Sequence, residues 1–376
     1  MKKLFFALIP VLVFLIAAKT TCAAPRYIFP TFPPCFPFCI SPTASPQPSP
    51  TNTATPTPLP TSVVTPTLTQ QPPQQSKLYW GAYVGDGVSS LSNVTAFESQ
   101  ANKKLGIVMW YQGWKVPDDT KNFQPTWMNN VRNHGSIPMI TWESWDYTKG
   151  INQPEYSLSS IINGNHDAYI RKFAQDSKAW GHPFFLRFDH EMNGNWYPWS
   201  EQVNGNSAGQ YVQAYRHVHD IFDQEGVTNV SWVWSVNVIG GSAVSIESLY
   251  PGDNYVDWVA MDGYNGGTAL NWGGWLTFTQ VFQTTYQHLT ALTTKPVMVS
   301  ETASAERGGN KASWITSAYG NEIDSMNRIK AIIWFNANKE TDWRINSTTR
   351  SRNAFRTAIG NQKYCSNDFT NLNSNP

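Results

Sequence analysis

The sequence predicts one (β/α)8 barrel, the TIM-barrel fold, preceded by a disordered linker rich in proline and threonine. From about residue 77 the chain repeats short apolar runs, and amphipathic segments of helical length lie between many of them. Strands that alternate with helices indicate βαβ units and a parallel sheet. Eight such runs in roughly 290 residues fit a closed barrel with modest insertions. The alternative, a doubly wound open sheet, would require a glycine-rich phosphate turn after the first strand, and residues 81–87 do not match that pattern.

The apolar runs and the amphipathic segments define the expected elements. Strands are expected at 79–84, 105–110, 137–142, 184–188, 230–236, 256–261, 297–299 and 331–334. Helices are expected at 166–180, 209–224, 277–292 and 311–326. The barrel is therefore assigned to residues 77–365 and a C-terminal tail to residues 366–376.

Residues 1–24 have the pattern of an export signal. Lys2 and Lys3 precede an apolar run from Leu4 to Ala18, and small residues follow at Cys22-Ala23-Ala24. The run is short for a membrane span and lacks a charged stop-transfer flank, so cleavage is expected. A secreted or cell-surface protein with no membrane span in the mature chain follows from this pattern.

Residues 25–76 form the expected linker. Fifteen of the 25 prolines lie between residues 25 and 75, mixed with threonine, serine and glutamine. Such a segment cannot bury enough apolar area to offset the entropy lost on ordering. It is therefore expected to be an extended, disordered spacer.

The cysteines leave several possibilities open. Cleavage of the signal would leave Cys35, Cys39 and Cys365, and an exported chain permits disulfides. Cys35 and Cys39 could pair locally, or either could pair with Cys365, and the odd count leaves one thiol over. Cys22 would allow lipid attachment, although Lys19-Thr20-Thr21 are not the small apolar residues that precede a lipidated cysteine.

The composition favours a neutral ligand that stacks on aromatic rings. The net charge is +1, charged residues make up 14% of the chain, and aromatic residues also make up 14%, with 17 tryptophans. This charge favours neither nucleic acid nor an anionic membrane. Rings without an excess of lysine or arginine suit a polysaccharide better than a nucleotide. A monomer is expected.

Polar and aromatic residues stand at the ends of most expected strands. The run from Arg187 to Trp199 begins as a strand and becomes an aromatic loop, with Glu191 at the junction, and Glu301 stands at a second such junction. The C-terminal strand ends of a barrel converge on one site. Two carboxyl groups there suit retaining glycoside hydrolysis, in which one acid protonates the leaving oxygen and one carboxylate attacks the anomeric carbon from roughly 5–5.5 Å away.

These motifs resemble glycoside hydrolase family 26 over about residues 77–360. The matching residues are Arg187-Phe188-Asp189-His190-Glu191-Met192-Asn193-Gly194 with Trp196 and Trp199, Asp262-Gly263-Tyr264, Ser300-Glu301 and Trp334. The family consists of retaining barrel enzymes, mostly endo-β-1,4-mannanases, with mixed-linkage β-1,3-1,4-glucanases and β-1,3-xylanases among them. No metal or organic cofactor is expected.

The resemblance assigns a role to each matching side chain. Glu191 would be the acid/base and Glu301 the nucleophile. Tyr264 would hydrogen-bond the nucleophile, and His190 would orient groups next to the acid. Trp334 would lie under the sugar at the cleavage point, and Trp196 would stack on the leaving-group side.

Four further strand-end residues are candidates for substrate binding, and several alternatives stay open. These residues are Trp110, Trp142, Glu143 and Asp262. Glu143 could instead be the proton donor or part of the scaffold, and Asp262 could be a structural partner. Glu191 could form a salt bridge with Arg187, and Glu301 could cap the following helix. Trp272 and Trp275, in a loop rich in glycine and tryptophan, could line distal sugar subsites or pin the loop.

Two departures from the family bear on the substrate. Residues 108–114 contain no histidine where many mannanases have one, and Phe335 follows Trp334 where some mannanases have arginine. The frequency of mannanases in the family predicts an endo-β-1,4-mannanase, and the departures favour the mixed-linkage β-glucanase alternative. A carbohydrate-binding barrel without catalysis is the competing class, although such proteins usually lose one of the two acids.

Overall fold

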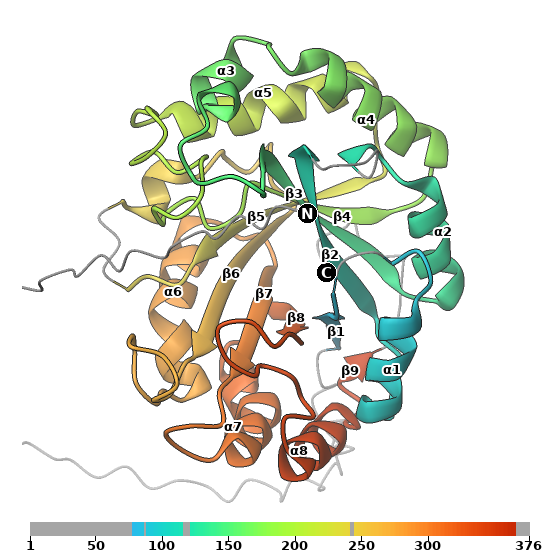
Figure 1. The fold of residues 1–376 in the computed structure, drawn as a ribbon, viewed down its shortest axis with the longest axis vertical. Coiled ribbons are helices and arrows are strands. Elements are labelled where there is room, and N and C mark those ends of the chain that lie inside the picture. The colour runs from blue at the N-terminus through green and yellow to red at the C-terminus, as the bar shows by residue number, and fades with distance from the viewer. Residues whose placement is uncertain (1–76, 86–87, 116–120, 241–243, 366–376) are drawn as a thin grey trace, which may run out of the picture. The chain divides into compact units, whose positions relative to one another are not determined.

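Eight parallel strands form the centre of the domain that the structure describes, and helices surround them (Figure 1). The computed structural model describes residues 77–85, 88–115, 121–240 and 244–365. Each strand pairs with the next in chain order, and β1 pairs with both β8 and β2, which closes the barrel. The strands are β1 (Leu78–Tyr83), β2 (Ile107–Lys115), β3 (Ile137–Asp146), β4 (Phe184–Phe188), β5 (Val230–Asn237), β6 (Trp258–Asn265), β7 (Val297–Ser304) and β8 (Ile329–Phe335). The predicted TIM barrel is confirmed.

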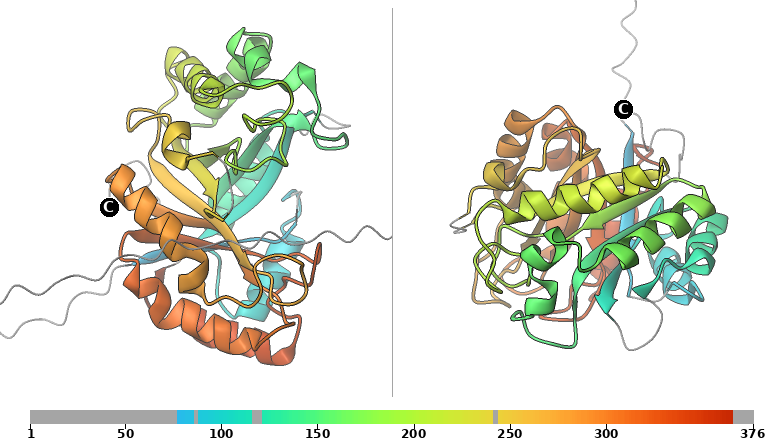
Figure 2. Two further views of the ribbon diagram at one scale, coloured as in Figure 1. Left: turned by 90° about the vertical axis from the view of Figure 1, so that its left-hand side faces the viewer. Right: turned by 90° about the horizontal axis from the view of Figure 1, so that it is seen from above.

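Helices fill most of the connections between the strands. They are α1 (Ser92–Ala101), α2 (Pro125–His134), α3 (Leu158–Ile162), α4 (Asp167–Trp180), α5 (Gln210–Gln224), α6 (Phe278–Leu292), α7 (Lys311–Ser317) and α8 (Thr349–Ile359). Short 3-10 turns occur at η2 (Pro154–Tyr156) and η3 (Ile246–Leu249), and η3 lies between β5 and β6. The α4 and α5 helices lie side by side on the outside of the barrel (Figure 2).

Only the first part of the expected helix at 311–326 is an α-helix. The α7 helix ends at Ser317, a π-helical turn η4 (Ala318–Glu322) follows, and a 3-10 turn η5 (Ile323–Ser325) completes the segment. Gly320 lies inside the π-helical turn, and glycine is a poor residue for a helix interior because it loses the most backbone entropy on folding.

Alternation along the strands divides the core into two layers. Residues from all eight strands, such as Tyr79, Met109, Phe185 and Ile333, meet inside the barrel. Their neighbours in the sequence point outward and pack under the helices in a larger cluster. Because successive side chains of a strand face opposite sides, one step along a strand decides whether a residue faces the barrel interior or the helices.

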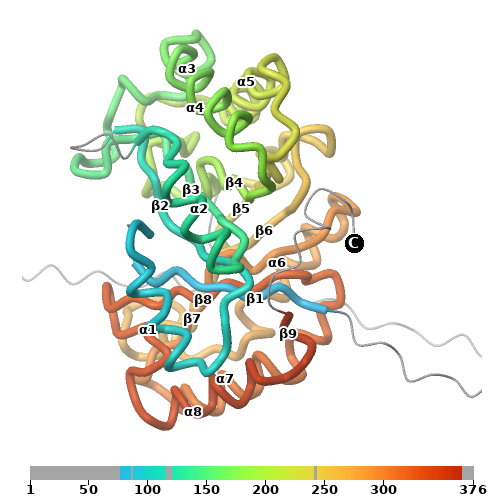
Figure 3. Tube along the Cα trace, turned by 90° about the vertical axis from the view of Figure 1, so that its right-hand side faces the viewer, coloured from blue at the N-terminus to red at the C-terminus, as the bar shows by residue number. Residues whose placement is uncertain are grey.

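A short ninth strand, β9 (Tyr364–Cys365), pairs with the start of β1 (Figure 3). Lys103 fixes β9 and the chain just before it, since its Nζ donates to the carbonyls of Ile359, Asn361 and Tyr364. The Cys365 Sγ lies 3.3 Å from the Leu78 carbonyl oxygen. The C-terminal end of the barrel domain is therefore tied to its first strand.

The predicted export signal, the linker, the C-terminal tail at residues 366–376, and Cys22, Cys35 and Cys39 lie outside the described residues. The possible disulfides therefore stay predictions. Within the described ranges, every helix is too short or too polar to cross a membrane.

Candidate active site

A β-bulge turns Glu301 into the barrel. On β7, Met298 packs in the barrel interior and Val299 under the helices. The pairing with β6 then shifts by one residue, so that Met261 lies opposite Val299 but Asp262 lies opposite Glu301. Without this shift Glu301 would point outward, because it stands three positions after Met298. Bulges of this kind re-aim side chains at the rims of barrels.

Three donors from three strands hold the Glu301 carboxylate. The Tyr111 hydroxyl on β2 donates to Oε1 at 2.5 Å, and the Arg187 guanidinium on β4 donates to the same oxygen. The Tyr264 hydroxyl on β6 donates to Oε2. Both oxygens of the carboxylate are therefore fixed. The alternative in which Glu301 caps the next helix is wrong, since Asn310 caps α7 by accepting from the Ser313 amide.

Arg187 links Glu301 to a second buried carboxyl group. Its Nη1 donates to Asp262 Oδ2 at 2.8 Å, its Nε donates to the Thr141 hydroxyl at 2.9 Å, and its side chain is fully buried. This pairing with Asp262 and Glu301 replaces the salt bridge to Glu191 that the sequence left open.

Asp262 is a structural partner in this arrangement. It has no exposed surface, and the hydroxyls of Ser235 and Ser300 donate to its oxygens at 3.2 and 2.6 Å. Its predicted role in substrate binding is therefore wrong, because Arg187 and the two serines enclose it. Burial raises the pKa of Asp262 well above its usual range, while the charge of Arg187 opposes that rise.

An unusual backbone path places Glu191 at the end of β4. Asp189 and Glu191 both have left-handed conformations, with φ of 44° and 54°. Residues with side chains rarely adopt this region, and such strain is common at functional sites. The path is fixed by hydrogen bonds from the Asp189 amide to the Trp142 carbonyl and from the Glu191 amide to the Ser235 carbonyl. Ser144 also binds the Asp189 carboxyl group, through its amide at 2.8 Å and its hydroxyl at 2.7 Å.

The Glu191 carboxyl group has a different environment from that of Glu301. Trp196 Nε1 donates to Oε2 at 2.8 Å, and Asn237 Nδ2 donates to Oε1 at 3.0 Å. Burial, followed by the charge of Glu301, raises the pKa of Glu191 to about 7, although the two hydrogen bonds act in the opposite direction. The site thus combines a carboxyl group that keeps its proton up to about pH 7 with a carboxylate bound by a guanidinium.

His190 lies between two glutamates. Its Nδ1 is 3.9 Å from Glu143 Oε1, its Nε2 is 3.9 Å from Glu301 Oε1, and its ring centre is 4.8 Å from that of Tyr197. Burial, followed by the charge of Arg187, lowers the pKa of His190 well below its usual value, so the ring is neutral. Glu143 Oε2 accepts a hydrogen bond from Trp145 Nε1 at 3.1 Å.

Three of the predicted sugar-binding tryptophans lie elsewhere. Trp334, Trp110 and Trp142 are fully buried in the layer beneath the helices. The Trp334 ring packs against Phe355 of α8, and its Nε1 donates to the Trp343 carbonyl. The Trp142 ring stacks on Phe173 of α4. Their predicted contacts with a sugar are therefore wrong, because each occupies an outward position of its strand.

Other aromatic residues face the site instead, among them Phe335, which follows Trp334. Phe335 stacks on Tyr83, with ring centres 4.9 Å apart, and meets Tyr264 edge-on. Trp343, from the loop after β8, lies 5.1 Å from Tyr264. The sequence did not predict these roles or that of Tyr111. Counting alternation from an inward residue such as Ile333 would have found Phe335, whereas Trp343 has no such signal because it lies in a loop.

His190, Asp262 and Glu301 each offer a possible metal ligand atom within 4.8 Å of one another. Arg187 already supplies the positive charge between the two carboxyl groups, through bonds to both. This arrangement fits a guanidinium better than a metal ion.

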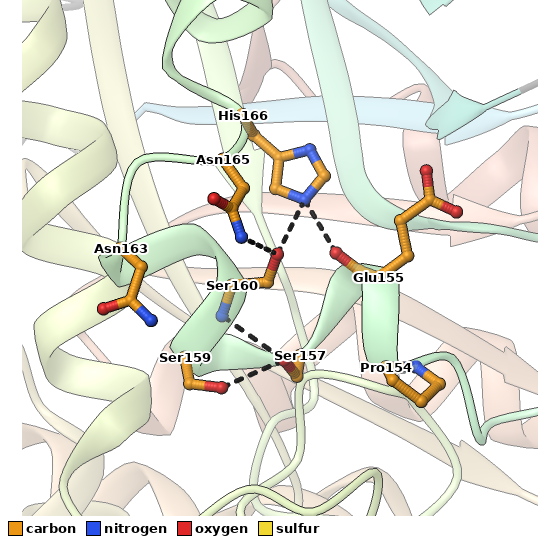
Figure 4. A pocket seen from close by; sticks show the side chains of 8 residues that line it. All are labelled: Pro154, Glu155, Ser157, Ser159, Ser160, Asn163, Asn165 and His166. Atoms are coloured by element: carbon orange, nitrogen blue, oxygen red, sulfur yellow. Dashed lines mark hydrogen bonds between the residues drawn. The ribbon is translucent and has the colours of Figure 1, made fainter.

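A hollow of about 580 Å³ lies at η2 and α3, and its lining includes neither Glu191 nor Glu301 (Figure 4). Its polar groups largely bind one another. His166 Nε2 lies 2.8 Å from the Glu155 carbonyl oxygen, and Asn165 Nδ2 donates to Ser160 Oγ at 3.0 Å. These bonds stabilise the turn between the two helices.

A closed barrel with two glutamates at the ends of its fourth and seventh strands has the architecture of a glycoside hydrolase. The model of glycosyl hydrolase family 26 matches residues 74–346, and the chain belongs to this family. The described residues therefore form a glycoside hydrolase family 26 domain, as the motifs had suggested.

Curated relatives of the chain carry several different names. Over 291 residues the chain is 46% identical to "Endoglucanase H" of Acetivibrio thermocellus, and the match covers 76% of the chain and 31% of that protein. Over 150 residues it is 29% identical to "Mannan endo-1,4-beta-mannosidase" of Bacillus subtilis, covering 35% of the chain and 41% of the relative. The chain thus spans less than half the length of each of these relatives.

Solved structures share the fold. The catalytic domain of the Bacillus sp. JAMB-750 GH26 endo-β-1,4-mannanase superposes with a TM-score of 0.61 at 18% identity, covering 80% of this chain and 90% of that one. The GH26 β-mannanase of Bacteroides ovatus gives 0.58 at 18% identity, covering 80% and 93%.

Proposed function

We propose that this chain is a retaining endo-β-glucanase in which Glu191 is the acid/base and Glu301 the nucleophile. The contrast between the two carboxyl groups carries the proposal. Glu191 has a pKa raised to about 7, so it can hold a proton to donate, whereas Glu301 accepts hydrogen bonds from Arg187, Tyr111 and Tyr264. Retaining hydrolysis needs one protonated and one ionised carboxyl group at the same site.

The reaction follows from these positions. The Glu301 carboxylate attacks the anomeric carbon while Glu191 protonates the departing glycosidic oxygen, which leaves a covalent glycosyl-enzyme. Glu191, now a carboxylate, takes a proton from water, and the water oxygen attacks the same carbon and releases Glu301. Tyr264 and Arg187 hold the nucleophile's oxygens in place, and the neutral ring of His190 adds no charge beside it.

Two observations support β-glucan over β-mannan as the substrate. Residues 108–114 of β2 contain no histidine, where many mannanases have one, and Phe335 ends β8, where some have an arginine. The relative named "Endoglucanase H" also matches 76% of the chain at 46% identity, whereas the mannosidase of Bacillus subtilis matches 35% at 29%. β-1,4-Mannan is the second candidate because several solved family members are mannanases. The export pattern at residues 1–24 supports action outside the cell.

Initial rates on lichenan and barley β-glucan are expected to exceed those on galactomannan and glucomannan at equal mass concentration. Mannose and glucose differ in the orientation of the 2-hydroxyl, so the polar groups beside the cleavage point decide between them. Release of reducing ends measures the rates, and β-1,3-xylan completes the panel. A faster rate on both mannans would favour the mannanase, and binding without release would favour a barrel that has lost catalysis.

The pH profile should report the proton on Glu191. Because the acid acts in its protonated form, kcat/KM is expected to fall as pH rises through about 7. Replacing Asn237 with alanine removes a hydrogen bond that lowers this pKa, so the alkaline limb should move to higher pH. The kcat/KM profile of the free protein between pH 4 and 9 tests both statements. An alkaline limb that stays in place or moves to lower pH in Asn237→Ala would contradict the assignment of the limb to Glu191.

A further inference from the structure

Exposed large apolar side chains gather on the face of the barrel that carries the glutamates. Among the described residues, the large apolar side chains that are strongly exposed are Tyr147, Ile151, Trp196 and Trp272. All four lie in connections that follow the C-terminal ends of strands, namely β3, β4 and β6. Exposed aromatic side chains on one face indicate a binding surface. Trp196 joins this face to the site, since its Nε1 donates to Glu191 Oε2.

Two of these side chains, Trp196 and Trp272, pack on the protein in the same way. A Cβ placed on Gly194 would lie 2.5 Å from the Trp196 ring, and a Cβ placed on Gly266 would lie 3.1 Å from the Trp272 ring. Each indole therefore packs directly against a glycine that leaves room for it. The tryptophans remain 44% and 48% exposed, so much of each ring is open to solvent.

The loop that carries Trp272 is held in place. Gly267 and Gly274 form an antiparallel bridge across it, and the Leu276 amide donates to Asn265 Oδ1 at 3.0 Å. The Thr268 amide donates to the Arg307 carbonyl at 3.0 Å, which joins this loop to the one that follows β7. A ring on a fixed loop can bind a ligand without the entropy loss of ordering the loop.

Trp275 explains how the two loops fit together. Its ring packs directly against Gly309, in the loop after β7, where a Cβ would overlap the indole. The sequence left open whether Trp272 and Trp275 bind sugar or pin the loop. The structure separates them, since Trp275 is partly buried between the loops and Trp272 is exposed.

We infer that Trp272 is a stacking platform for a sugar unit of the bound glycan, at a subsite other than the one beside Glu191. The inference rests on the proposed glycan hydrolysis and adds a binding position to it. Trp196 bonds to Glu191 and so lies next to the cleavage point, whereas Trp272 extends the aromatic surface to the loop after β6. The C–H face of a β-linked pyranose packs on an open indole face, and the ligand is a chain long enough to reach both rings.

The test compares a long and a short oligosaccharide of the glycan that the wild type cleaves fastest. Trp272→Ala is expected to lower kcat/KM on the long oligosaccharide about tenfold, which corresponds to about 1.4 kcal/mol of lost binding. This fall should come from a higher KM with kcat unchanged, because stacking at a distal subsite stabilises the ground state and the transition state equally. On the shortest cleaved oligosaccharide Trp272→Ala should match the wild type, and Trp272→Phe should recover part of the loss.

Trp180→Ala is the matched control, since it removes an indole at the end of α4, and it should show no dependence on chain length. An equal loss of kcat/KM on long and short substrates in Trp272→Ala, or no loss on either, would overturn the inference that Trp272 is a stacking platform. A wild type that cleaves no glycan would instead overturn the proposed function. Calorimetric binding of a long β-glucan oligosaccharide to wild type and Trp272→Ala would then decide the platform by itself.

Discussion

Replacing Glu301 with glutamine is expected to lower kcat by at least about 10³-fold on every glycan that the protein cleaves. Glutamine keeps the shape of the side chain but cannot form the covalent glycosyl intermediate. The loss should be the same whatever the leaving group, because the attack on the anomeric carbon itself is removed. Steady-state rates on the best polysaccharide and on an aryl glycoside of the same sugar measure it.

The glutamine variant of Glu191 separates the two roles. Its kcat should fall by about 10²–10⁴ on a polysaccharide, whose leaving group needs a proton. On an aryl glycoside with an acidic phenol, formation of the glycosyl-enzyme should be nearly normal, because that leaving group departs without protonation. Glu247→Gln is the matched control, since Glu247 is an exposed glutamate paired with His288. Similar dependence on the leaving group in the two site variants would refute the assignment of roles.

Arg187→Met is expected to lower the free energy of unfolding by about 3–5 kcal/mol, the usual effect of removing one partner of a buried ion pair. Methionine fills part of the volume but leaves Asp262 and Glu301 buried without their cation. Two carboxyl groups in this position can no longer both ionise at low cost, so activity should fall together with stability. Denaturant unfolding and kcat at pH 6 measure the two effects.

Arg171→Met is the control for that experiment. Arg171 pairs with Glu225 at 3.0 Å, but its side chain is 37% exposed, and such surface pairs contribute about 0–1 kcal/mol. If the two variants lose similar amounts of stability, the buried pair does not have the role given to it here.

The fold was predictable because barrel strands and helices differ in their apolar period. The apolar run at 184–188 matches β4 at both ends. The two glutamates were also predictable, since each stands where an apolar run gives way to polar residues. The direction in which a side chain points was harder to predict, because it depends on counting along the strand from a residue known to face inward. Trp334 and Phe335 are neighbours in the sequence, but the Trp334 ring packs against Phe355 of α8 whereas Phe335 meets Tyr264.

Glu301 shows why simple alternation would also have failed. Counted from Met298 it falls on the outward side, and the bulge that reverses it depends on how β7 pairs with β6. That pairing involves residues far apart in the sequence, so the residues next to Glu301 do not predict the bulge. The contacts of Trp343 and the capture of Arg187 between Asp262 and Glu301 likewise appear only once the barrel has closed.

The left-handed backbone at Glu191 creates a trade-off between thermal stability and catalytic turnover at this residue. Glycine and asparagine adopt this conformation with less strain than glutamate does. A laboratory evolution experiment that rewards only survival at high temperature would therefore favour exchange of the very residue that donates the proton. Recombination with stabilised barrels has the same risk. A less strained turn after β4 would make the protein more stable but would remove the acid that protonates the leaving group.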